Sequence, residues 1–189
     1  MTDVAVPSHV PASATADGDG IVLGTGPLVV DAYIDFLCPF CRQFELNAGD
    51  ALAGLVSAGQ ISLAYHPMNF LDAASTTQYS TRAAAASGCA SDGGRFAEYA
   101  HALFVSQPPE GGPGLTDAQL AELAESVGLP GRTFAECGQT GRYLDWPTYV
   151  TAQATARGVQ STPTVLVNGA PVPASGRMIT AAVAAAAAR

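Results

Sequence analysis

The chain has 189 residues, a formal net charge of −8, 48% hydrophobic and 13% charged residues, and all eight of its basic residues are arginines. This composition is typical of one well-buried globular domain and excludes intrinsic disorder. The acidic balance argues against nucleic acids and anionic membranes as partners, and no apolar stretch is long enough to span a membrane.

The first 20 residues are rich in Pro, Ser, Ala, Thr, Asp and Gly, which predicts a flexible leader. They contain neither a basic region nor an apolar core, so they do not form a signal peptide. The four cysteines, an even number, nevertheless suggest an oxidising compartment. We therefore expect an extracytoplasmic protein, secreted or membrane-anchored, whose export signal or anchor is absent from this sequence. A cytoplasmic location is the alternative.

A strand, a sharp turn and a helix carry the first cysteine pair. After a short edge strand at 21–23, the run 29–37 is apolar on both faces, as in a strand that is covered on both sides. Pro39 suits the first turn of a helix, and apolar residues then recur with a helical period. Cys38 is therefore expected at the helix N-terminus, where free N–H groups favour a thiolate, and Cys41 on the face towards the core.

An exposed thiolate backed by a shielded thiol is the geometry that thiol–disulfide exchange needs, because one sulfur attacks and the other resolves the mixed disulfide. Half of a zinc site and an inert disulfide are the alternatives. Zinc requires two more ligands, and the sequence has no second C-x-x-C, no H-x-x-x-H and only three scattered histidines. We therefore expect neither a metal nor an organic cofactor, the disulfide itself being the redox centre.

The middle of the chain reads as one strand followed by helices. The alternating run 61–66 predicts a second core strand, parallel to the first through a right-handed crossover. Helical patterns follow over about 76–107 with a break near 91–94, over about 116–127 with a capping box, and over about 145–157.

The segment after the second strand leaves the sheet near the redox pair. Its apolar residues Met68, Phe70 and Leu71 either line a substrate groove or pack the corner between sheet and helices. The sequence leaves both interpretations open.

The C-terminal part is predicted to form a β-hairpin and a helix. Strands at 165–167 and 171–173 flank the favoured turn Asn168-Gly169. Ser175 can cap a last helix over 176–188.

Two stretches resemble the DsbA-like branch of the thioredoxin superfamily. They are Phe36-Leu37-Cys38-Pro39-Phe40-Cys41, preceded by Asp35, and Gln160-Ser161-Thr162-Pro163-Thr164-Val165-Leu166-Val167-Asn168-Gly169. In that superfamily a residue followed by a cis-proline lies against the redox pair, and Thr162-Pro163 matches this position; an ordinary proline at the start of a strand is the alternative.

The resemblance implies an α/β thioredoxin-like fold with a helical insertion subdomain that overhangs the active site. We accordingly divide the chain into a leader (1–20), a thioredoxin-like domain (21–75 and 158–189) and an inserted helical subdomain (76–157).

The second cysteine pair, Cys89 and Cys137, lies in the helical insertion. We predict a structural disulfide between them that staples this subdomain. Two separate buried thiols, or a shuttle pair that passes electrons to Cys38, are the alternatives.

The chain departs from the family at two places. The buried acid that family members carry six residues before the first cysteine is Ala32 here. Asp35 is a substitute for proton transfer with Cys41, although strand alternation places it on the face opposite Phe36. The dipeptide between the cysteines is Pro-Phe and lacks the histidine of strongly oxidising members, so we expect a milder oxidant. Arg42 is interpreted as a solvated surface charge.

We predict a protein thiol–disulfide oxidoreductase in which Cys38 reacts and Cys41 resolves. Its substrates would be cysteine-containing proteins, a membrane or thiol partner would reset the pair, and the protein is expected to be a monomer. A glutathione-dependent isomerase or transferase, against which the resolving cysteine argues, and a non-catalytic binding module are the alternatives. The residues predicted to bind and orient the substrate are Pro39, Phe40, Thr162 and Pro163.

Overall fold

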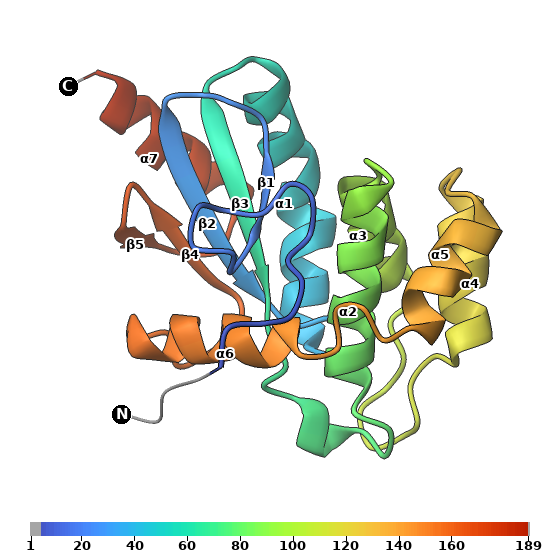
Figure 1. Ribbon diagram of the computed structural model, residues 1–189. Coiled ribbons are helices and arrows are strands. Elements are labelled where there is room, and N and C mark those ends of the chain that lie inside the picture. Colours follow the sequence, from blue (N-terminus) through green and yellow to red (C-terminus); the bar gives the residue numbers. More distant parts are fainter. Residues whose placement is uncertain (1–4, 189) are drawn as a thin grey trace.

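The computed structural model describes residues 5–188, which form a mixed β-sheet with a group of helices beside it (Figure 1). The strands are β1 (Ile21–Leu23), β2 (Leu28–Ile34), β3 (Ile61–Pro67), β4 (Thr164–Val167) and β5 (Ala170–Val172). The helices are α1 (Pro39–Ser57), α2 (Tyr79–Asp92), α3 (Phe96–Val105), α4 (Asp117–Ser126), α5 (Gly131–Gln139), α6 (Trp146–Ala156) and α7 (Gly176–Ala187), with a short 3₁₀ helix η1 (Asp72–Ala74) after β3.

The sheet has the strand order β1-β3-β2-β4-β5. β2 pairs in parallel with β3 and antiparallel with β4, so it is the central strand. Its last three residues are buried, whereas Val29 is exposed and Asp31 is half-buried. α1 makes the crossover from β2 to β3. The helices α2 to α5 follow β3 in the chain and stand together beside the sheet, whereas α6 lies across its end (Figure 1). This is the α/β architecture with a helical insertion that the sequence predicts.

β2 is shorter than the predicted strand at 29–37 and ends at Ile34. The cause is Asp35, whose carboxylate accepts a hydrogen bond from the Leu37 N–H two residues on, at 2.8 Å, and so closes an Asx-type turn. The backbone N–H of Cys38 then donates to the Asp35 carbonyl at 3.0 Å. This turn delivers the chain directly into α1.

The helix α5 was not predicted. Its sequence has glycines at 131 and 138, and Phe134 is its only buried residue, so a helix of nine residues offers too few apolar positions for a helical period to be recognised. Cys137 on α5 is joined to Cys89 on α2 by a disulfide with a Cα–Cα distance of 6.0 Å. A covalent bond therefore joins this helix to α2, and the ring of Phe134 lies 5.2 Å from that of Tyr99 on α3.

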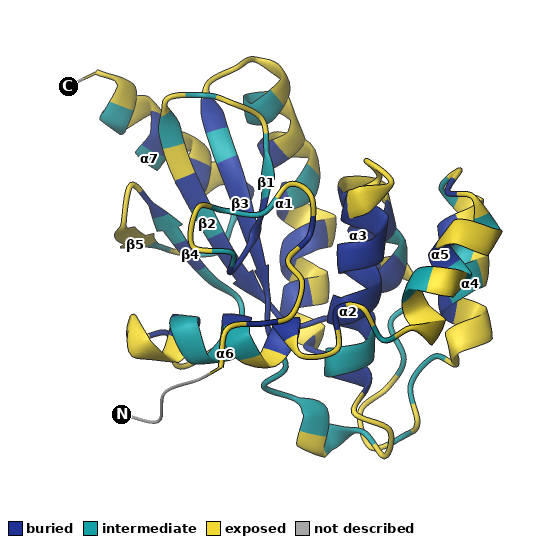
Figure 2. Ribbon diagram, in the orientation of Figure 1, coloured by how far each residue is buried: buried dark blue, intermediate teal, exposed yellow. Residues whose placement is uncertain are grey.

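The core is continuous from the sheet into the inserted helices (Figure 2). The ring of Phe36, just after β2, lies 5.0 Å from that of Phe104 on α3, which ties the redox turn to the insertion. The largest fully buried side chains belong to both parts, and include Trp146, Tyr79, Tyr99, Tyr143, Phe36 and Phe104.

Residues 7–20 differ from the prediction of a flexible leader, because they are bonded to the body of the protein. The Ala12 N–H donates to Asp92 on α2, the indole of Trp146 donates to the Gly18 carbonyl at 2.8 Å, and Arg157 pairs with the buried Asp19. Backbone groups of this segment thus bond to side chains of α2 and α6, and the Asp19 side chain bonds to Arg157 at the end of α6. We therefore propose the predicted division of the chain with one change: residues 7–20 belong to the folded body.

None of the helices within residues 5–188 combines the length and the hydropathy that crossing a bilayer requires.

Replacing Cys89 and Cys137 together by alanine should lower the free energy of unfolding. The bond closes a loop across a sequence separation of 48 residues, for which the chain-entropy model gives about 4 kcal/mol. Urea unfolding of the variant measures the loss. Replacing Cys38 and Cys41 by serine, which keeps the staple, is the matched control. Equal stability of the wild type and the Cys89/Cys137 variant would show that the bond does not stabilise the fold.

Candidate active site

The cysteines of the C-P-F-C sequence lie at the start of α1. Cys38 is the residue that caps the helix, Pro39 occupies its first turn, and Cys41 lies within that turn. Both are free thiols in the structure. Cys41 is completely buried and Cys38 is only 4% exposed, so Cys38 is more covered than the sequence suggested. The covering group is Thr162, whose carbonyl oxygen lies 3.4 Å from the Cys38 sulfur.

The pKa of Cys38 is lowered to about 6. The largest cause is the hydrogen bond that Cys41 donates to the Cys38 sulfur. Burial opposes it, while the Thr162 side chain and the backbone N–H groups of Phe40 and Cys41 add to it. These N–H groups are the unpaired donors of the helix N-terminus, which stabilise a thiolate. Most Cys38 is therefore thiolate at neutral pH.

The pKa of Cys41 moves the other way, well above its ordinary value. Burial is the main cause, followed by the hydrogen bond to Cys38 and the negative charge on that sulfur. The two thiols thus divide into one that ionises readily and one that holds its proton.

The Thr162–Pro163 peptide bond is cis. It lies just before β4, and the Thr162 carbonyl faces the redox pair as described above. The structure therefore brings Cys38, Cys41, Thr162 and Pro163 together at one end of the sheet.

Asp35 is the residue whose importance the sequence understated. Its side chain is fully buried and accepts three hydrogen bonds, from the Leu37 N–H at 2.8 Å, the Ser80 hydroxyl at 2.7 Å and the Leu71 N–H at 2.9 Å. Its own backbone N–H points to the Cys41 sulfur at 3.5 Å. Asp35 therefore connects the turn before Cys38, the segment after β3 and α2 directly beside the two cysteines.

The predicted opposition of Asp35 and Phe36 across a strand is wrong, because β2 ends before them and both are fully buried. Burial is the main cause that raises the pKa of Asp35, to about 6; its hydrogen bonds act against the shift, and the charge on Cys38 adds to it. The signal in the sequence was an acid directly after an apolar strand, three residues before the helix cap.

Gln107, in the loop after α3, was also missed. Its side-chain amide donates to the carbonyls of Phe36 at 2.9 Å and Cys38 at 3.0 Å. Arg42 remains exposed, as predicted, but its Nε donates to the Phe104 carbonyl at 3.0 Å. Two polar side chains, Gln107 from the insertion and Arg42 from α1, thus connect the insertion to the redox turn and its helix. Such contacts between distant parts of the chain could not be predicted, because a long polar side chain in a loop has no periodic pattern in a single sequence.

A hollow of about 410 Å³ opens beside Cys38. We name it the Cys38 hollow; its lining residues are Cys38, Pro39, Phe40, Phe70, Leu71, Glu110, Gln160, Ser161 and Thr162. Phe40 is 65% exposed and also lines a second hollow, next to Pro163. The sequence left open whether Met68, Phe70 and Leu71 line a substrate groove or pack the corner between sheet and helices. Phe70 and Leu71 line the Cys38 hollow, whereas Met68 is fully buried in the core.

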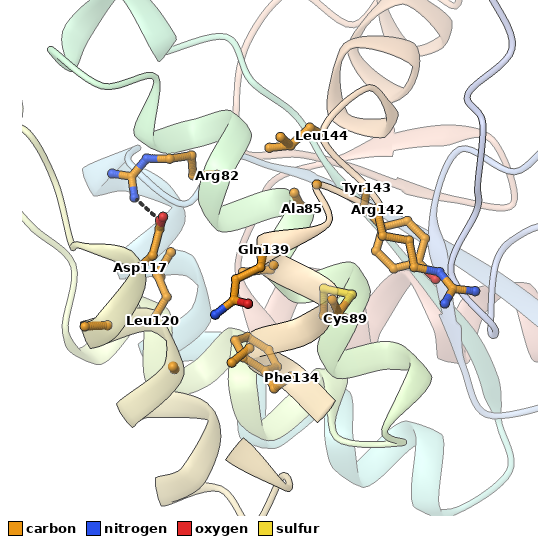
Figure 3. A pocket seen from close by; sticks show the side chains of 17 residues that line it. Arg82, Ala85, Cys89, Asp117, Leu120, Phe134, Gln139, Arg142, Tyr143 and Leu144 are labelled. Carbon is orange, nitrogen blue, oxygen red and sulfur yellow. Dashed lines mark hydrogen bonds and ion pairs between the residues drawn. A yellow bond between two sulfur atoms is a disulfide. The ribbon is translucent and has the colours of Figure 1, made fainter. Parts of the chain in front are cut away.

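A separate cavity of about 390 Å³ lies between α2, α4 and α5 (Figure 3). The disulfide between Cys89 and Cys137 forms part of its wall, and Arg82 pairs with Asp117 at its edge at 2.9 Å. None of its lining residues belongs to the Cys38 hollow. We assign it no part in the redox chemistry.

Within residues 5–188 no three side chains of His, Cys, Asp or Glu gather in a way that could hold a metal ion.

Comparison with known proteins identifies the relatives of this chain. A sequence family described as Thioredoxin matches residues 17–182. The serine/threonine-protein kinase PknE of Mycobacterium tuberculosis is 35% identical over 153 residues, which are 76% of this chain and 26% of that protein. The chain thus spans about a quarter of the length of the curated relatives it matches.

Solved structures match over most of the chain. The reduced disulfide bond oxidoreductase DsbG of M. tuberculosis has 34% identity and a TM-score of 0.77, over 88% of this chain and 86% of that one. The reduced DsbA of the same organism has 35% identity and a TM-score of 0.71, over 81% and 84%. The thiol-disulfide oxidoreductase MdbA of Actinomyces oris, at 21% identity, has a TM-score of 0.76 over 93% and 92%, a likeness of fold alone.

Alkylation of the reduced protein by iodoacetamide should reveal the acidic thiol. With a pKa of about 6, the rate at Cys38 should be half-maximal near pH 6 and rise only about tenfold from pH 5 to pH 7, because thiolate is the reactive form. Cys41 should stay unmodified. Mass spectrometry after timed quenching measures both rates. A rate that keeps rising to pH 9, or equal labelling of both cysteines, would contradict the proposed electrostatics.

Replacing Asp35 by asparagine should change how stability depends on pH. The folded carboxyl holds its proton up to about pH 6, whereas an unfolded Asp titrates near 3.9. Its contribution to the free energy of unfolding is therefore full below about pH 4 and lost as the pH rises through 6.

The difference in unfolding free energy, wild type minus Asp35→Asn, should accordingly fall by about 2 kcal/mol between pH 4 and pH 7. Urea titrations of the oxidised forms, in which Cys38 cannot titrate, measure this difference. Replacing the exposed Asp50 by asparagine is the control. A difference that stays constant or grows with pH would contradict the assignment.

Proposed function

The chain belongs to the DsbA-like branch of the thioredoxin superfamily, and from this we propose that it is a thiol–disulfide oxidoreductase of protein substrates. The observation that carries the proposal is the placement of two free thiols at the start of α1, with Cys38 at the helix N-terminus and Cys41 fully buried beside it. The thiol pKa values shift accordingly, downward at Cys38 and upward at Cys41. A sulfur that ionises at neutral pH can attack or leave, and its protonated neighbour can resolve.

The exchange runs in two balanced steps. In the oxidising direction a substrate thiolate attacks the Cys38 sulfur, the Cys38–Cys41 bond breaks, and Cys41 leaves with the electron pair and takes up a proton. A second substrate thiolate then attacks the substrate sulfur of the mixed disulfide, which releases Cys38 as thiolate. Reduction of a substrate is the reverse sequence. The backbone N–H of Asp35, 3.5 Å from the Cys41 sulfur, stabilises charge as it develops there.

We propose that Thr162 and Pro163 orient the substrate chain. The segment 160–162 forms one wall of the Cys38 hollow, and Thr162 lies beside the attacking sulfur. An extended peptide placed along this wall can pair with its backbone, in the way that an added strand joins a sheet edge. Pro39 and the exposed Phe40 would offer the peptide an apolar surface.

We propose that the substrates are cysteine-containing proteins and that a membrane or thiol partner returns the pair to its working state. The redox centre would be the Cys38–Cys41 disulfide alone, without metal or organic cofactor. An extracytoplasmic location is supported by the additional disulfide between Cys89 and Cys137, because such bonds persist in oxidising compartments. We retain the monomer as the proposed state.

A glutathione-dependent isomerase or transferase on a related fold is less well supported, because such chemistry does not use a resolving thiol and Cys41 lies in contact with Cys38. A binding module with an inert disulfide is also less well supported, since an inert pair has no need of a thiol with a pKa of about 6. The Pro-Phe dipeptide supports a milder oxidant than members with histidine. A measured potential near about −270 mV would mark a reductase, and one near about −120 mV an oxidase.

Replacing Cys38 by serine should abolish both the reduction of insulin and the refolding of reduced ribonuclease. Replacing Cys41 by serine should instead let the mixed disulfide accumulate, because the resolving thiol is gone. Non-reducing gel electrophoresis detects the trapped complexes. The variant in which alanine replaces Cys89 and Cys137 is the control and should keep both activities. Unchanged activity of Cys38→Ser would exclude the proposed mechanism.

A further inference from the structure

The Cys38 hollow has a distinctive distribution of charge. Apart from the cysteine itself, Glu110 is the one charged side chain in its lining. Glu110 also lines a neighbouring hollow of about 440 Å³ on the other side of Pro39, which contains Arg42. Glu110 therefore lines both hollows, and one of them also contains the reacting Cys38.

The loop that carries Glu110 is fixed at both ends. On one side the Gln107 amide is bonded to the carbonyls of Phe36 and Cys38. On the other side the Gly111 N–H donates to the Ala74 carbonyl at 2.7 Å. The prolines at 108 and 109 restrict the backbone between these anchors. The backbone at residue 110 is thus held at the rim of the site before any substrate arrives.

The carboxylate of Glu110 is exposed and has no partner of its own within residues 5–188. The carboxylates that form ion pairs in this part of the chain are those of Asp17, Asp19, Asp31, Glu45, Glu98 and Asp117. Arg42, in the neighbouring hollow, has its Nε bonded to the Phe104 carbonyl. A negative charge that stands on an anchored backbone beside the site, and that forms no ion pair within residues 5–188, favours a positive group on whatever enters.

From this arrangement we propose that Glu110 is a specificity-determining residue, and that the preferred substrates carry a lysine or arginine within about two residues of the reacting cysteine. The inference rests on the proposed function and adds the substrate class. An extended chain advances about 3.3 Å per residue, so a long basic side chain two positions from the cysteine still reaches the rim. The net charge of −8 favours the approach of the same basic segments.

The test uses the reduced full-length protein and three peptides. Each peptide has one cysteine, linked by a disulfide to 5-thio-2-nitrobenzoate, and carries Lys, Gln or Glu two residues away on both sides. The Cys38 thiolate attacks the peptide sulfur, the S–S bond breaks, and the coloured thiolate leaves; Cys41 then displaces the peptide thiolate from Cys38. Release followed at 412 nm gives the second-order rate constant. Division by the rate with dithiothreitol removes the intrinsic reactivity of each peptide.

The normalised rate should be about three- to tenfold higher for the Lys peptide than for the Glu peptide at low ionic strength. Replacing Glu110 by glutamine should bring this ratio towards one, replacing it by lysine should invert it, and 0.5 M salt should weaken it. Replacing Asp50 by asparagine removes the same charge twelve residues along α1, about 18 Å from Cys38, and should leave the ratio intact.

Equal normalised rates for the three peptides, or a ratio that Glu110→Gln leaves unchanged, would overturn the inference while the redox function stands. If no peptide releases the coloured thiolate faster than it does with free cysteine at the same concentration, the proposed function itself fails, and the inference with it.

Discussion

The redox site depends on one buried carboxylate. Asp35 is fully buried and receives hydrogen bonds from the β2–α1 turn, from Leu71 after β3 and from Ser80 on α2. A buried charge that loses such partners costs several kcal/mol, so these three segments are held together. These segments surround the cysteines: the turn leads into the helix that carries them, Leu71 lines the Cys38 hollow, and Ser80 belongs to the inserted helices. A single side chain therefore connects the sheet and the insertion at the site.

The chemistry follows from the difference in surroundings between two identical side chains. Cys38 accepts hydrogen bonds from the helix N-terminus and from Cys41, whereas Cys41 is enclosed by the core. The inserted helices supply no reacting group to the thiol–disulfide exchange; they hold the turn that carries Cys38 in place. Gln107 bonds to the redox turn, and the loop that follows it brings Glu110 into the lining of the Cys38 hollow.

Much of the fold was predictable because the signals are local. The apolar run before Cys38, the proline after it and the capping box at Thr116 each act within a few residues, and the structure has a strand or helix at each place. The exceptions are instructive. α5 was missed because it buries only Phe134, and residues 7–20 were predicted to be flexible because their composition does not reveal distant partners.

The sequence by itself determined the architecture, the family and the pair of cysteines at a helix N-terminus, since hydrophobic period, capping and a short motif depend on neighbouring residues. Only the tertiary structure decided that Asp35 lies beneath the pair, that Thr162 covers Cys38, and that Gln107 and Glu110 reach the site from the insertion. The reason is physical. Thr162 and Gln107 contact Cys38 from 124 and 69 positions away along the chain. Asp35 is close to Cys41 in sequence, but Leu71 and Ser80, 36 and 45 positions away, hold its side chain. The geometry of these contacts is set by how the sheet and the inserted helices pack.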